Sequence, residues 1–142
     1  MVNKILNAIT KQLGTTFGSS YKYYVENVKQ GMTKPCFTID VLEPRERSRS
    51  LILYDRTMPI VIHYFNDDES TVKKDSYAIA EQLKEALEYL PFEGSFLRSE
   101  NVSWQMVENV LQLFVTYKFV TRNVTEDEIG MYDLGYDNKT IN

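Results

Sequence analysis

Hydrophobic positions recur at helical spacing in two stretches of the chain. Near its start, five apolar residues share one helical face: Val2, Ile5, Leu6, Ile9 and Leu13. Asn3 can cap this segment and Gly14 can stop it, so the pattern predicts a helix over 3–13. A second apolar helical face is followed by Pro91, which cannot continue a helix. We therefore predict a second helix over 70–89.

The rest of the chain is rich in residues that favour strands. The predicted strands are 21–28, 36–47, 56–65, 96–108 and 110–121. The segment "SLILYDR" fits either the end of a hairpin or the start of the strand that follows it. Pro59 lacks a backbone donor, so we expect its strand to lie at a sheet edge or to be irregular there. The last two strands meet at "VENV", a predicted hairpin turn.

The last strand, "LQLFVTYKFV", is partly apolar on both of its faces. One face carries Leu111, Leu113, Val115, Tyr117 and Phe119, and the other carries Gln112, Phe114, Thr116, Lys118 and Val120. Both faces should therefore be covered, by helices or by a neighbouring chain. Short connections between strands indicate a mainly antiparallel sheet flanked by the N-terminal helix and the central helix, in an α+β fold.

The stretch "PCFTIDVLEPRERSRS" changes character halfway. Its first part alternates as a half-buried strand does, and then Arg45, Arg47 and Arg49 continue at the same two-residue spacing. These arginines can protect a strand edge from pairing with other sheets, which is the interpretation that the pattern alone favours. They can also form a basic arm, a projecting β-hairpin offered to another molecule.

Composition and charge indicate one domain with an acidic tail. The chain has 142 residues, is 43% hydrophobic and 13% aromatic, and carries a net charge of −4. Residues 123–142 hold five acids against Lys139 alone, so they account for the whole net charge, and residues 1–122 are neutral. We predict a single domain over 1–122 and an acidic C-terminal tail over 123–142. A neutral body is a poor general binder of nucleic acid.

Two further features bear on the compartment. No apolar run approaches the ~18 residues that a membrane-spanning helix needs, and the polar N-terminal stretch is not typical of a signal peptide. Cys36 is the only cysteine, so neither an internal disulfide nor a cysteine metal site is expected. Both features favour a protein of the cytosol, or one assembled there, without a membrane partner.

Candidate chemistry is sparse. His63 and Cys36 could lie on adjacent strands, but a strand histidine and a small buried cysteine are the more common roles. The cluster Asp67, Asp68 and Glu69 is more typical of the solvated start of a helix than of a magnesium site. No phosphate-binding glycine motif is present in the sequence. We therefore expect no enzyme activity, no cofactor and no metal.

Several phrases in the chain resemble the tail terminator proteins of long-tailed phages and related prophages of Gram-positive bacteria. After the N-terminal helix come "YVENVKQGMTKPCFTIDVLE", an arginine-containing loop and "RTMPIVIHYF". A helix "YAIAEQLKEALEYL" and the hairpin "WQMVENVLQLFVTYKFV" follow, so that the resemblance covers residues 1–121. The phrases "QGMTKPCF" and "IHYF" are the most typical of the family.

This resemblance implies a structural protein of the virion tail, assembled in the host cytoplasm. Tail terminators form a ring, usually a hexamer, that caps the tail tube, stops its polymerisation and presents a surface for joining the head. The implied partners are further copies of the chain, the major tail tube protein and the head–tail connector protein. Arg45, Arg47 and Arg49 would then face a neighbouring subunit or the channel, with possible non-specific contact to DNA.

Other functions stay open at this point. A head–tail connector, a stopper or a tail-completion protein of the same apparatus is built on a similar small α+β subunit. A small cytosolic α+β binding module belongs to a different class. An enzyme would require His63 or the acidic residues at 67–69 to be essential.

Overall fold

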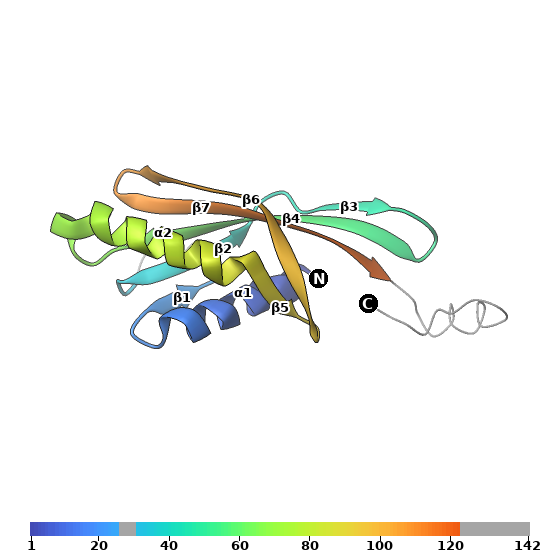
Figure 1. The fold of residues 1–142 in the computed structure, drawn as a ribbon, viewed down its shortest axis with the longest axis horizontal. Coiled ribbons are helices and arrows are strands. Elements are labelled where there is room, and N and C mark those ends of the chain that lie inside the picture. Colours follow the sequence, from blue (N-terminus) through green and yellow to red (C-terminus); the bar gives the residue numbers. More distant parts are fainter. Residues whose placement is uncertain (26–30, 123–142) are drawn as a thin grey trace.

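A computed structural model describes residues 1–25 and 31–122, and Figure 1 shows their arrangement. The elements are α1 (Val2–Phe17), β1 (Lys22–Tyr24), β2 (Cys36–Val41), β3 (Arg45–Ser48), β4 (Leu53–Phe65), a 3-10 turn (Glu69–Thr71), α2 (Val72–Glu88), β5 (Tyr89–Phe92), β6 (Ser95–Val107) and β7 (Val110–Arg122). The predicted α+β class is confirmed. The predicted tail over 123–142 lies outside the described residues, and the proposed domain boundary stays a prediction.

The strands form one curled, mostly antiparallel sheet. Its strand order is β1-β2-β4-β7-β6-β5, and β3 pairs with the other end of β4. Among the described strands, only β1 and β2 run parallel to each other. The long central strand β4 pairs with β2 and β3 along one of its edges and with β7 along the other, so it fixes the positions of these three strands.

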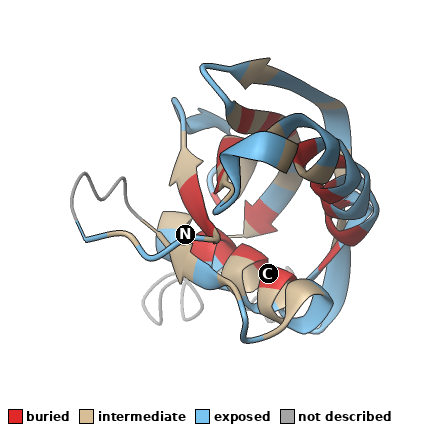
Figure 2. Ribbon diagram, turned by 90° about the vertical axis from the view of Figure 1, so that its left-hand side faces the viewer, coloured by how far each residue is buried: buried red, intermediate tan, exposed pale blue. Residues whose placement is uncertain are grey.

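Both helices pack on the same face of this sheet. Even-numbered residues of β4 and odd-numbered residues of β7 enter the core, in agreement with the predicted faces of α1 and α2. Figure 2 shows buried positions on helix and strand faces that look toward one another, while the outer side of α2 is exposed. The core residues include Ile5, Ile9, Leu13, Phe37, Ile39, Ile60, Ile62, Leu83, Leu87, Leu113, Val115 and Tyr117.

The second apolar face of β7 points away from both helices. Phe114 lies opposite Val61 of β4, and consecutive strand residues alternate between faces, so both side chains project from the side opposite the core. Val120, further along the same side, is 44% exposed. Neither helix supplies the cover that we predicted for this face, yet Val61 is only 5% exposed and Phe114 is partly buried, so other parts of the chain cover these two residues. A neighbouring chain remains the alternative for the exposed Val120.

The first helix is longer than predicted. It runs through Gly14 to Phe17 and ends at Gly18, whose φ of 84° favours glycine. The extension places the Phe17 ring 4.9 Å from that of Phe37, so burial of an aromatic pair outweighs the low helix propensity of Gly14. Asn3 lies inside the helix and is not its cap.

The start of the second helix and the segment that follows the helix also differ from the expectation. The second helix begins at Val72, because Asp68 accepts the Ser70 backbone N–H and starts a 3-10 turn before the helix. It ends before Pro91 as predicted, but the residues around that proline form the unforeseen strand β5. A tight turn at Glu93 and Gly94, both with positive φ, joins β5 to β6.

Pro59 lies in a central strand and not at an edge, yet the pairing is interrupted beside it. The Pro59 carbonyl accepts a hydrogen bond from the Leu42 backbone N–H at 2.8 Å. In an antiparallel strand the N–H and C=O of one residue point to the same neighbour, so the missing donor of Pro59 faces the gap between β2 and β3. The predicted irregularity is present, and it divides the predicted strand 36–47 in two.

Candidate functional site

The break between β2 and β3 inserts one extra residue opposite β4. Val41 pairs with Ile60, and the next paired residue, Arg45, lies opposite Thr57. The β2–β3 segment thus advances by four residues while β4 advances by three. A single additional residue in one strand is characteristic of a β-bulge, and Pro59 accommodates it because it has no donor to leave unpaired.

This extra residue moves the arginines out of the core. Phe37 and Ile39 point toward the helices, and without the bulge the odd-numbered residues that follow would do so too. With it, Arg45 and Arg47 pair with Thr57 and Asp55, which lie on the opposite face of β4. The arginines keep their two-residue spacing, but they project from the other side of the sheet.

The arginines lie on a projecting part of the sheet, which we call the arm. It consists of residues 45–57, which form the β3–β4 hairpin, and of residues 118–122 at the end of β7. Figure 1 shows this part extending beyond the two helices. The predicted projecting hairpin is confirmed, and β7 adds a third strand to it.

One face of the arm collects basic side chains from two strands. Thr57 has Arg45 on one side and Lys118 on the other, while the Leu53 carbonyl accepts the Arg49 backbone N–H and Leu53 pairs with Arg122. Cross-strand partners project from the same face of a sheet. We call the resulting set the basic face of the arm: Arg45, Arg47, Arg49, Lys118 and Arg122, with Asp55 as its acidic member.

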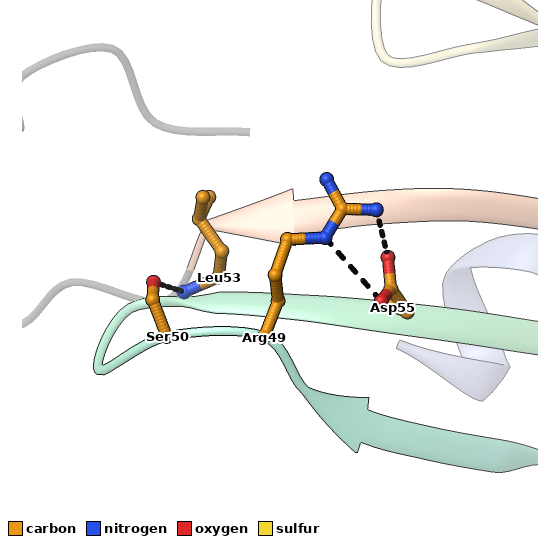
Figure 3. A network of polar contacts seen from close by, with 4 residues as sticks. All are labelled: Arg49, Ser50, Leu53 and Asp55. Atoms are coloured by element: carbon orange, nitrogen blue, oxygen red, sulfur yellow. Dashed lines mark hydrogen bonds and ion pairs between the residues drawn. The ribbon is translucent and has the colours of Figure 1, made fainter.

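The acidic residue on this face is already engaged. Asp55 accepts hydrogen bonds from Arg49, at 2.6 Å from Nη2 to Oδ1 and 3.4 Å from Nε to Oδ2 (Figure 3). The Ser50 hydroxyl accepts the Leu53 backbone N–H at 3.2 Å and helps to close the turn.

The remaining cations of β3 and Lys118 face a groove. Within residues 1–25 and 31–122, Arg45, Arg47 and Lys118 make no ion pair. All three line a shallow groove of ≈ 690 Å³, together with Thr57 and two acidic residues, Glu46 and Asp55. The groove is thus bordered by more positive than negative side chains.

The opposite face of the arm is held by a different arginine. Arg56 donates from Nε to the Thr121 hydroxyl at 2.6 Å and from Nη1 to Glu46 at 3.1 Å, so it ties all three strands together. Its side chain is only 15% exposed. Arg56 is thus a structural residue, whereas Arg45 and Arg47 of the basic face are exposed to solvent.

Comparison with known proteins identifies the family. The family model described as "Phage tail terminator protein" matches residues 4–129. The chain belongs to the phage tail terminator family. A search of curated proteins finds no match. The members of this family are structural proteins of the phage tail, which indicates a location in the virion tail.

Within this tail terminator chain, the sole histidine and sole cysteine form no nucleophilic pair. Their cross-strand partners are Thr38 for His63 and Phe65 for Cys36, so they are not opposite each other. Burial raises the pKa of the Cys36 thiol, which disfavours the reactive thiolate. Burial also lowers the pKa of His63, and nearby Asp40 opposes that shift. These features favour a structural role for both residues.

The acidic cluster at the start of α2 has a local role as well. Asp68 accepts the hydroxyl of Ser70 at 2.7 Å and its backbone N–H at 3.0 Å, and these bonds lower the pKa of Asp68. No group of three or more potential ligand residues that could hold a metal occurs in the part of the chain that the structure describes. None of the helices there is long and apolar enough to cross a membrane.

The sequence pointed to three members of the basic face and missed two. Lys118 is the β7 partner of Thr57, and Arg122 is the β7 partner of Leu53. Both residues are far along the chain from the arginines at 45–49, and they join them only because β7 pairs with β4. Alternation along the last strand placed Lys118 on the face opposite Tyr117, and that was the only local signal for it.

Proposed function

We propose that this chain forms a ring, most simply a hexamer, that caps the tail tube, stops its polymerisation and joins the tail to the head. The observation that carries the proposal is the family match over residues 4–129. The partners are further copies of the chain, the major tail tube protein and the head–tail connector protein. Assembly takes place in the host cytoplasm.

Two features of the fold support a role in assembly. The sheet face that points away from both helices carries the partly exposed Phe114 and the exposed Val120, and a ring would bring other subunits or the tube against such a surface. The arm extends beyond the helices and presents Arg45 and Arg47 to solvent. In a ring, an arm of this kind reaches the next subunit or lines the channel.

Electron microscopy of particles that lack this protein tests the proposal. Tails of uncontrolled length that return to normal when the wild-type chain is supplied are the expected result. Tails of normal length without heads would contradict it, and would indicate a connector or tail-completion protein instead. Normal infectious particles would contradict both assignments.

A further inference from the structure

We propose that the basic face of the arm binds the phosphate backbone of DNA without sequence selectivity. This binding deepens the proposed function and rests on it, because DNA would meet the arm in the channel of the ring. Its ligand is defined by chemistry: a chain of phosphodiesters, recognised by charge and by hydrogen-bond donors.

The cations of this face are arranged in two rows. Arg45 and Arg47 lie on β3 and Arg49 follows it, with alternate strand residues about 7 Å apart, while Lys118 and Arg122 lie on β7. Because β4 lies between these strands, the rows are about 10 Å apart. A chain of phosphates that runs between the rows therefore has cations on both sides of its path.

Three of these cations have no acidic partner within the arm. Two acidic residues, Asp55 and Glu46, also border the groove, but Asp55 is paired with Arg49 and Glu46 with Arg56. Arg45, Arg47 and Lys118 make no ion pair within the described residues, and all three line the groove of the arm. A neutral body thus carries a local excess of positive charge, which is what phosphate binding requires.

The predominance of polar and charged side chains on the basic face favours nucleic acid over a protein partner. Protein interfaces usually have an apolar core inside a polar rim, whereas protein–DNA interfaces are more polar and more positively charged. On the basic face, Thr57 and Asp55 lie between the two rows. Its apolar members are Leu53, at the end of the arm, and Val120, which lies between Lys118 and Arg122 and is 44% exposed. The apolar pair Val61 and Phe114 lies on the same side of the sheet but nearer the body.

Fluorescence anisotropy with labelled duplex DNA of two unrelated sequences tests the inference on the full chain. The variant Arg45→Ser/Arg47→Ser/Lys118→Ser removes three cations from two strands of one face. Its matched control, Lys73→Ser/Lys74→Ser/Lys84→Ser, makes the same change of charge on the exposed side of α2. Circular dichroism melting shows whether each variant remains folded.

We expect the wild type to bind both duplexes equally and to lose affinity steeply with salt. The arm variant should lower the slope of log K against log salt by about 2–3, since each lost phosphate contact removes about 0.9. The α2 variant should leave the slope unchanged. Equal losses in both variants, or no binding by the folded wild type at low salt, would overturn the inference.

A competition with poly-L-glutamate separates DNA from an acidic protein surface. If the polypeptide displaces DNA at equal charge concentration, the face recognises negative charge in general and the assignment to DNA fails. The proposed function is tested separately, by tail length in particles that lack the chain, and that readout does not depend on DNA binding. Uncontrolled tails in particles without the chain, together with lost DNA binding in the arm variant, support both claims. Uncontrolled tails with unchanged DNA binding in the arm variant support the proposed function and overturn this inference, whereas normal tails with lost DNA binding support this inference and contradict the proposed function.

Discussion

Strand β4 runs through two regions of the molecule, the body and the arm, which are stabilised by different interactions. In the body, Ile60 and Ile62 are fully buried beneath the helices. In the arm, which extends beyond the helices, Arg56 ties the strand to its neighbours through polar contacts. Alternation along the strand is the same in both regions. The comparison teaches that one strand can be stabilised by burial at one end and by hydrogen bonds at the other.

The largest expected effect comes from the body. Leu83 lies fully buried on α2, so Leu83→Ala should lower the free energy of unfolding by about 2–5 kcal/mol, measured by denaturant titration. The matched change in the arm is Leu51→Ala, at a residue that is 76% exposed. It should have almost no effect, and equal losses in the two variants would break the contrast between body and arm.

The next effect tests how the arm is held. Arg56→Ala removes two hydrogen bonds of a charged, mostly buried side chain, so we expect a loss of about 1.5–3 kcal/mol in the free energy of unfolding. Arg45→Ala, on the exposed face, serves as the control. If Arg56→Ala is as mild as its control, the three strands of the arm are held mainly by their backbone ladders.

A buried polar contact inside the body should matter less. The Tyr117 hydroxyl donates to the Leu87 carbonyl at 2.6 Å and is fully buried. Tyr117→Phe leaves that carbonyl without this partner, at a cost of about 1 kcal/mol in denaturant unfolding. Tyr89→Phe, at a residue that is 51% exposed, is the control. If Tyr117→Phe left the free energy of unfolding unchanged, the end of α2 would not depend on this hydrogen bond for its stability.

These residues show what the sequence could and could not predict. Helical spacing predicted the apolar face of the second helix that includes Leu83, and alternation grouped Tyr117 with the apolar residues of one strand face, because both patterns are local consequences of backbone geometry. Which face of that strand meets the helices was not predicted. The bulge beside Pro59 could not be predicted in the same way, because it depends on how two distant segments register. For that reason the sequence did not show from which face of the sheet the arginines project, and it did not show that Lys118 lies on the same face.

Acid should weaken the body through its only histidine. Burial lowers the folded-state pKa of His63 below its ordinary value, so the unfolded chain takes up a proton first as the pH falls. Stability should therefore decrease as the pH falls below about 6.5, and level off below the folded-state pKa. Melting temperatures of wild type and His63→Gln between neutral and mildly acidic pH measure this, and parallel curves would contradict it.

The smallest effect on stability is expected from the basic face itself. Arg45→Ser/Arg47→Ser/Arg49→Ser should change the free energy of unfolding by no more than about 1 kcal/mol, because exposed charges contribute little even when paired. The Arg49–Asp55 pair fits this expectation, since its side chains are 55% and 38% exposed. Thermal melting measures the effect, and a loss of many degrees would show that the arm needs these charges to fold.

Once this triple variant is known to fold, it also distinguishes the roles that the arm can have in the assembled tail. If the arginines meet acidic residues of a neighbouring subunit, rings on tail tubes should form poorly, and wild-type assembly should weaken with salt. If they face DNA, rings should form normally while DNA retention or passage suffers. A variant that caps tails and supports infection as well as the wild type would leave only protection of the β3 edge, the function that charged residues on an exposed strand commonly serve.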